Sequence, residues 1–207
     1  MSAVDITHGF TREAVEALSH QKAEPDWVRQ KRLDAWDVFE RMPWPSMQEE
    51  EWRKTDVRGL KLQRLASFTE PNGAAQGGDL PAEISASGDV AERGGLVIQR
   101  DSMTVSNQLQ EELRRQGVVF CDLDAAVRDY PELVRRYFQT CVPVDFNRFS
   151  ALHNSFWSGG SFVYVPKGAD VTLPLQASFW ASKPGAAMFP HTLVIADRDS
   201  RVTYIDQ

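Results

Sequence analysis

The chain has 207 residues, of which 42% are hydrophobic and 25% charged, a composition typical of a soluble globular protein with a real core. The net charge of −6 and the pI of about 5.3 argue against nucleic acid as the main ligand, because phosphate binding needs a surplus of Lys and Arg. No run of about 18 apolar residues would span a membrane, no secretory signal is recognisable, and two cysteines make no disulfide framework, so we expect a cytoplasmic protein.

Two helices are predicted in the first part of the sequence. Thr11 suits an N-cap, with Phe10 and Val15 placed as a hydrophobic staple. A second helix follows Pro25, carries apolar residues at helical spacing and ends at Pro43. We therefore assign residues 1–70 to an N-terminal helical region.

Four of the six tryptophans lie close together in this region. They are Trp27, Trp36, Trp44 and Trp52. One interpretation is a small helical core packed around indoles, and the other is an exposed aromatic surface for a partner. Aromatic residues at helical spacing usually face a core, which favours the first interpretation.

The middle of the chain consists of two segments with different residue patterns. Residues 71–95 are rich in glycine, show no sustained period and are expected to form a linker. Residues 96–146 form a mixed α/β segment, in which alternating residues predict a hairpin over 96–107. A short helix stopped by Gly117, a strand over 118–123 and two further helical pieces complete the segment.

Strand-like patterns dominate residues 147–207, where no helix is expected. The apolar runs cover 162–166, 171–180, 191–197 and 201–207, with turn residues about every ten positions. This spacing predicts an all-β layer, a sandwich or a solenoid. Pro166 and Pro174 favour solenoid corners or edges, and a last strand without a cap suggests that Gln207 is not the natural end of the fold.

A search for catalytic motifs assigns no catalytic, cofactor-binding or metal-binding residue. There is no phosphate-binding loop, no nucleophile elbow and no histidine pair at zinc-binding spacing. Cys121 and Cys141 could together hold an iron–sulfur cluster, and His153 could be a ligand or an acid/base, but a structural role is favoured for each. The carboxylate pairs Asp122/Asp124 and Asp197/Asp199 suit helix caps and turns.

The stretch from Arg148 to Trp180 resembles a known family. Trp157-Ser-Gly-Gly-Ser-Phe, Tyr164-Val-Pro-Lys-Gly and Leu173-Pro-Leu-Gln follow one another as in the SufB/SufD family, the scaffold proteins of the SUF iron–sulfur assembly system. Residues 191–206 resemble the next segment of that family. Near the N-terminus, Glu50-Glu-Trp-Arg-Lys-Thr-Asp56 resembles the SufD pattern more than the SufB pattern.

The resemblance implies a fold and a role. It implies an α+β protein in which the helical domain is followed by the first rungs of a right-handed parallel β-helix, over 147–207, left incomplete in an N-terminal fragment. It implies a non-enzymatic subunit of the SufBCD complex that assists iron–sulfur cluster assembly and iron acquisition. SufB and the ATPase SufC would be its partners, mostly through regions beyond this chain, and the cluster would be handled by the whole complex with no cofactor here.

Two alternatives remain open. One is a SufB-type scaffold, which would differ in the N-terminal segment and in downstream cysteines. The other, from a different class, is a β-helix protein acting on carbohydrate, which should carry clustered carboxylates on successive rungs. The visible strands carry mainly apolar and hydroxyl residues, which disfavours the carbohydrate alternative.

Overall fold

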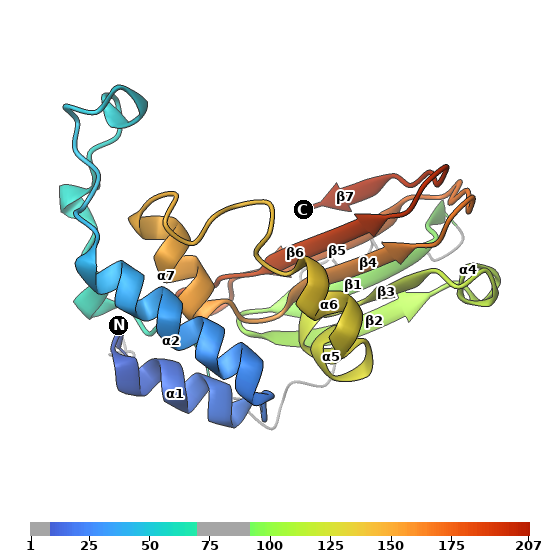
Figure 1. Ribbon diagram of the computed structural model, residues 1–207, viewed down its shortest axis with the longest axis horizontal. Coiled ribbons are helices and arrows are strands. Elements are labelled where there is room, and N and C mark those ends of the chain that lie inside the picture. The colour runs from blue at the N-terminus through green and yellow to red at the C-terminus, as the bar shows by residue number, and fades with distance from the viewer. Residues whose placement is uncertain (1–8, 70–91) are drawn as a thin grey trace. The chain divides into compact units, whose positions relative to one another are not determined.

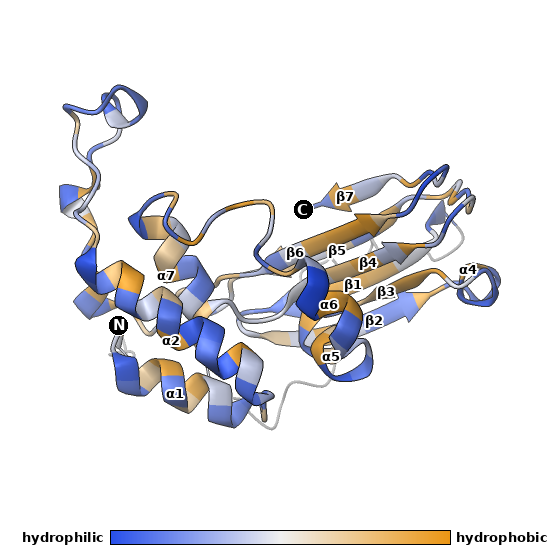
Figure 2. Ribbon diagram, viewed as in Figure 1, coloured by the Kyte–Doolittle hydropathy of each residue, from blue (hydrophilic) through white to orange (hydrophobic). Residues whose placement is uncertain are grey.

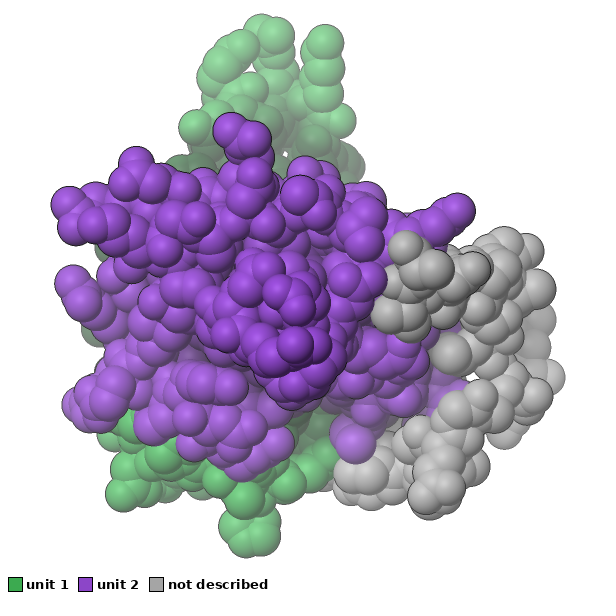
Figure 3. Space-filling model, turned by 90° about the vertical axis from the view of Figure 1, so that its right-hand side faces the viewer, with its two compact units in different colours: residues 1–68, 139–157, 184–187 green, residues 69–138, 158–183, 188–207 purple. Residues whose placement is uncertain are grey.

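A computed structural model describes residues 9–69 and 92–207 of the chain. These residues form two compact units, coloured separately in Figure 3. The helical unit comprises residues 1–68, 139–157 and 184–187, and the sheet unit comprises residues 69–138, 158–183 and 188–207. The expected linker, 71–95, lies mostly outside the described residues, and its last residue, Gly95, begins the first strand.

The helical unit is built on three α-helices (Figure 1). They are α1 (Arg12–Gln21), α2 (Asp26–Arg41) and α7 (Arg148–Phe156). The predicted N-cap is confirmed, since the Thr11 hydroxyl accepts a hydrogen bond from the Ala14 amide at 3.1 Å. Both α1 and α2 mix apolar and hydrophilic residues along their length (Figure 2), and the apolar residues Val15, Leu18 and Val28 are fully buried.

Helix α7 corrects the expectation that no helix follows Asn147. The Asn147 side chain caps this helix by accepting a hydrogen bond from the Ser150 amide at 2.9 Å. The helix itself contains Phe, Ser, His and Asn, which are only moderate helix formers. Burial of Ala151, Leu152 and Phe156 against the other helices of the unit supplies the stability that local propensity does not.

The tryptophans divide between core and surface. Trp36 is only 4% exposed and packs edge-on against Phe156, as the core interpretation predicts. Trp44 is 39% exposed and Trp52 is partly exposed, and both rings contact Phe149. The segment after α2 contains three short 3-10 turns with no buried residue, η1 (Glu50–Trp52), η2 (Val57–Gly59) and η3 (Leu62–Arg64). The core interpretation therefore holds for Trp36 and not for Trp44.

The sheet unit contains seven strands and three helices among the described residues. The strands are β1 (Gly95–Arg100), β2 (Met103–Leu109), β3 (Val119–Cys121), β4 (Gly160–Val165), β5 (Leu175–Trp180), β6 (His191–Ala196) and β7 (Tyr204–Asp206). The helices are α4 (Glu111–Arg115), α5 (Leu123–Asp129) and α6 (Pro131–Tyr137). The predicted hairpin of β1 and β2 is confirmed, and Asp122 caps α5 as expected.

Two mixed sheets form the frame of this unit. One has the strand order β2-β1-β5-β7 and the other has the order β3-β4-β6. Side chains from both sheets meet in one buried cluster, in which Val97, Leu175 and Ala177 of the first sheet pack with Phe120, Val163 and Val165 of the second. The alternation of side chains along each strand places these residues between the sheets.

The expected β-helix is wrong. The described residues form an α+β fold with mixed sheets rather than a wound, all-parallel coil, because β1 pairs with β2 and β3 pairs with β4 in antiparallel fashion. Turn residues every ten positions do not distinguish a solenoid from strands that alternate between two facing sheets. The carbohydrate-active alternative required the same coil and loses its basis. Among the described residues, no helix combines the length and the apolar character needed to cross a bilayer.

Candidate functional site

The paired glycines that carry the family resemblance hold a tight turn next to the buried Gln99. The Gln99 side chain accepts a hydrogen bond from the Gly160 amide at 2.6 Å and donates to the Ser158 carbonyl at 2.9 Å. A Cβ atom on Gly160 would lie 2.1 Å from the His191 carbonyl oxygen, and one on Gly159 would lie 2.4 Å from Gln99 Oε1. Both glycines have positive φ angles, so this turn excludes side chains for steric reasons.

The buried residue Asp101 holds the loop that follows β5, beside this turn. Asp101 adopts a φ of 54° at the tip of the β1–β2 hairpin. Its carboxylate accepts hydrogen bonds from the Ser182 amide at 2.7 Å, the Ser182 hydroxyl at 2.6 Å and the Lys183 amide at 3.2 Å. The Gln99 side chain also donates to the Asp101 carbonyl at 2.6 Å. Because these partners satisfy both carboxylate oxygens, Asp101 fixes the loop and offers no free base.

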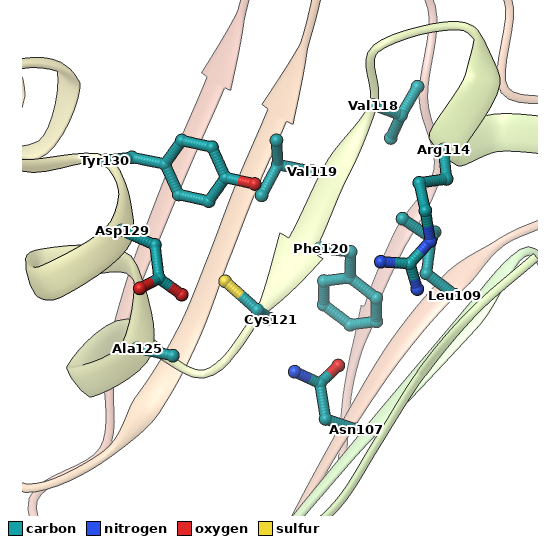
Figure 4. Close-up of a pocket in the computed structure, with 10 residues that line it drawn as sticks. All are labelled: Asn107, Leu109, Arg114, Val118, Val119, Phe120, Cys121, Ala125, Asp129 and Tyr130. Carbon is teal, nitrogen blue, oxygen red and sulfur yellow. The ribbon is translucent and has the colours of Figure 1, made fainter.

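The sheet unit contains a pocket of about 210 Å³ beside β3. Its lining comes from β2, α4, β3 and the residue before it, and α5 and the residue after it. It consists of Asn107, Leu109, Arg114, Val118, Val119, Phe120, Cys121, Ala125, Asp129 and Tyr130 (Figure 4). The Cys121 sulfur lies on the same side of β3 as Asp129 and Tyr130, whereas Phe120 points to the opposite side. The volume is below that of most small-molecule sites.

Cys121 is poorly suited to nucleophilic or ligand chemistry. Burial, together with the negative charges of Asp122 and Asp129, raises the pKa of the Cys121 thiol to about 12. A thiol must lose its proton before it attacks a substrate or binds a metal, so Cys121 is protonated near neutral pH. Cys141 is exposed and, like Cys121, is not in a disulfide. The two cysteines belong to different units.

His153 lies on α7 near a buried ion pair of the helical unit. Arg32 donates to Glu24 from Nε at 2.8 Å and from Nη2 at 2.6 Å, and to the Ser155 carbonyl from Nη1 at 3.1 Å. Burial and the positive charge of Arg32 lower the pKa of His153 to about 4. The imidazole is therefore neutral under physiological conditions and does not titrate near neutral pH.

The carboxylate pairs occupy the caps and turns expected for them. Asp122 accepts the Ala125 amide at the start of α5. Asp197 accepts the Arg198 amide through its side chain, and its carbonyl accepts the Ser200 hydroxyl. Within residues 9–69 and 92–207, no three His, Cys, Asp or Glu side chains are grouped so that they could hold a metal ion.

The polar residues that matter most to this structure could not be identified from the sequence. Gln99, Asp101 and Arg32 are buried, but nothing in their local pattern marks them as such. Their partners, Gly160, Ser182 and Ser155, are 61, 81 and 123 residues away in the chain. Only an alignment that pairs such distant positions could have indicated these contacts.

The fold and these polar contacts define an α+β protein whose buried polar side chains mostly hold loops and helices in place. Comparison with known families then identifies the group to which it belongs. The family described as SufBD protein N-terminal region matches residues 94–177. The chain belongs to the SufB/SufD family.

Several relatives match along nearly the whole chain. An iron–sulfur cluster assembly SufBD family protein of Mycobacterium tuberculosis is 36% identical over 218 residues, covering 100% of this chain and 25% of the relative. The iron–sulfur cluster assembly protein SufB of Bacillus subtilis is 33% identical over 208 residues, covering 96% of this chain and 43% of the relative. A SufBD family protein of Staphylococcus saprophyticus is 35% identical with the same coverage. The chain thus spans between a quarter and less than half of the length of these proteins.

Proposed function

We propose that this chain acts in iron–sulfur cluster assembly as a non-catalytic, SufD-type component of a SufBCD complex. The observation that carries the proposal is the match, over 96% to 100% of the chain, to relatives named for iron–sulfur cluster assembly. The SufD assignment is supported by the resemblance of residues 50–56 to the SufD pattern. The proposal also includes a role in iron acquisition, with SufC supplying energy by hydrolysing ATP.

The chemistry of the described side chains agrees with a non-catalytic role. The raised pKa of Cys121 and the lowered pKa of His153 leave both groups uncharged near neutral pH. The carboxylate of Asp101 is occupied by three hydrogen bonds. Two free thiols suit a reducing compartment, which supports a cytoplasmic location for the complex.

Co-purification tests the proposed partners. The native protein, tagged in its own cell, should retain SufB and SufC, whereas the 207-residue chain alone should neither hydrolyse ATP nor hold SufC tightly. We expect the SufC contact to lie mainly in regions outside these residues. Tight retention of SufC by the 207-residue chain would contradict this division of the binding surface, and the absence of both partners from the native complex would contradict the proposed role.

Anaerobic reconstitution with iron and sulfide tests whether this chain holds a cluster by itself. A protonated Cys121 is a poor ligand, so we expect no stable visible absorbance after removal of excess reagents. The matched controls are the Cys121→Ser and Cys141→Ser variants, which should give the same spectrum as the parent. A stable brown product that either substitution abolishes would oppose the non-ligand role.

A SufB-type role is the second candidate, and the match to SufB of Bacillus subtilis favours it. The two candidates differ in which deletion strain the native protein should complement. A SufD-type protein should restore growth of a strain that lacks SufD and fail in a strain that lacks SufB. The opposite pattern would assign the chain to the SufB type.

A further inference from the structure

The pocket beside β3 is lined by the main chain of that strand. Four consecutive residues, 118–121, contribute to its lining. Neighbouring side chains of a strand point to opposite faces, so four residues in a row line one pocket only where their main chain lines it too. Within residues 9–69 and 92–207, β3 pairs along one edge, with β4. The pocket therefore lies along the other edge of β3, which faces β2 across it.

The two walls of this pocket carry opposite charges. Figure 4 shows Arg114 on the side of β3 to which Phe120 points. Asp129 lies on the opposite side, to which Cys121 points. Arg114 Nε is 3.5 Å from a carboxylate oxygen of Glu111, but both side chains are well exposed, so this ion pair contributes little. A strand lying in the pocket would meet a positive charge on one of its faces and a negative charge on the other.

We propose that this pocket binds an extended segment of a partner protein, which adds to β3 as a further strand. Main-chain hydrogen bonds to β3 supply the affinity, and the alternating side chains of the segment supply the specificity. The segment carries an acidic residue next to a basic one. Because adjacent residues of a strand face opposite ways, the acidic side chain meets Arg114 while the basic side chain meets Asp129.

An extended peptide fits this pocket better than a small molecule does. The volume of about 210 Å³ is small for a drug-sized ligand. A strand edge offers a regular row of main-chain donors and acceptors, which a second strand matches along its whole length. The inference concerns this pocket alone, goes beyond the proposed role in cluster assembly and does not depend on it.

A nuclear magnetic resonance titration of the isotope-labelled 207-residue chain tests the proposal. The probe is a blocked hexapeptide, Thr-Val-Glu-Lys-Val-Thr, whose binding should shift the amide signals of residues 118–121. Arg114→Gln and Asp129→Asn should each raise the dissociation constant of the peptide about tenfold, because each removes one charge pair from the interface. Arg115→Gln and Glu132→Gln change exposed residues outside the pocket and should leave the dissociation constant unchanged.

Two further peptides separate strand addition from simple attraction between charges. Thr-Pro-Glu-Lys-Pro-Thr keeps both charges, but its prolines remove one main-chain donor from each of the two alternating sets of amides, so it should not bind. A hexapeptide with two central lysines should bind Arg114→Glu more tightly than it binds the parent, since both walls of the pocket are then acidic.

The native protein should bind the first hexapeptide with a similar dissociation constant, measured by saturation-transfer difference spectroscopy. Far-UV circular dichroism establishes that each variant is folded. Four outcomes would each overturn the proposal: no shifts at residues 118–121, equal binding of the proline peptide, no effect of either Arg114→Gln or Asp129→Asn, and a native protein that does not bind the hexapeptide.

Discussion

Gly160, the first residue of β4, is the position in this glycine turn at which a side chain would make the closest contacts. Replacing it with alanine would place a Cβ atom 2.1 Å from the His191 carbonyl oxygen and 2.3 Å from its amide nitrogen, at a φ of 103°. Both obstacles are backbone atoms of the neighbouring strand, so β4 and β6 would have to separate. We expect Gly160→Ala to lower the free energy of unfolding by about 3 kcal/mol or more, measured by urea titration.

Gly168 provides the matched control for this prediction. It also has a positive φ, of 74°, but a methyl group added there would meet no atom within 4 Å beyond its own chain neighbours. Gly168→Ala should therefore incur only the backbone strain of a left-handed residue, about 1–2 kcal/mol. Equal losses for the two variants would show that the contact with His191 is not what requires glycine at position 160.

The buried pair of Arg32 and Glu24 makes a second prediction at the residue scale. The two side chains are 0% and 4% exposed, and the Arg32 guanidinium also stacks 4.2 Å from the centre of the Trp157 ring. Glu24→Gln leaves the Arg32 charge buried without its counter-ion, which should cost about 3 kcal/mol of unfolding free energy. The exposed pair of Glu111 and Arg114 is the control, since Glu111→Gln should change stability by less than about 1 kcal/mol.

His153 should make stability depend on pH in acid. Its pKa of about 4 in the folded protein lies below its usual 6.5, so the unfolded chain binds the proton first as the pH falls. The contribution of His153 to stability is complete above pH 6.5 and is lost as the pH falls from 6.5 toward 4, with a slope of about 1.4 kcal/mol per pH unit. Unfolding curves at several pH values should show this slope reduced in His153→Gln, and an unchanged slope would contradict it.

At the scale of elements, three hydroxyl groups in mutual contact connect the two sheets and are called here the hydroxyl triangle. Tyr204 of β7 contacts Ser161 of β4 and Thr192 of β6 through its hydroxyl group. Tyr204→Phe removes these contacts and leaves the Ser161 hydroxyl with only its 3.3 Å contact to Thr192. We expect a loss of about 1–2 kcal/mol, together with faster amide exchange in β7.

Tyr164→Phe on β4 is the matched control for the triangle. Tyr164 faces away from the buried cluster and is partly exposed, so loss of its hydroxyl should leave both stability and exchange in β7 close to those of the parent. Faster exchange in β7 after Tyr164→Phe, or none after Tyr204→Phe, would argue against the triangle as the connection between the sheets.

Most elements could be predicted from local sequence, whereas the way they pair could not. Thr11 and Asp122 mark helix starts by capping them, and Pro131 lies in the first turn of α6. The hairpin of β1 and β2 is indicated by the alternation of apolar and polar residues over 103–106, in its second strand. Helix α7 escapes prediction because its residues are modest helix formers stabilised by packing. The antiparallel pairing of β3 with β4, about 45 residues apart in the chain, leaves no local signal, and this is where the β-helix expectation failed.

At the scale of the whole molecule, family membership could be predicted from the sequence, but the polar contacts that hold the fold could not. The glycine-containing motif at 157–162 identified the family, and the sequence could suggest a corner at Gly159 and Gly160 on steric grounds. The sequence could not show that the partner at this corner is Gln99, because that contact joins two elements 61 residues apart. The structural interpretation of Cys121 and His153 rests on chemical grounds, and their shifted pKa values are consistent with it.

The measurement that tests the central claim most directly is the activity of iron–sulfur enzymes in cells that lack the native gene. Deletion should lower the activity of a [4Fe–4S] enzyme such as aconitase while its protein level stays constant, and the native gene should restore it. A Cys121→Ser, Cys141→Ser double variant should restore the activity equally well, because neither thiol is assigned a cluster. Unchanged enzyme activity after deletion would contradict a role in cluster assembly, and failure of the double variant alone would contradict a scaffold role without cysteine chemistry.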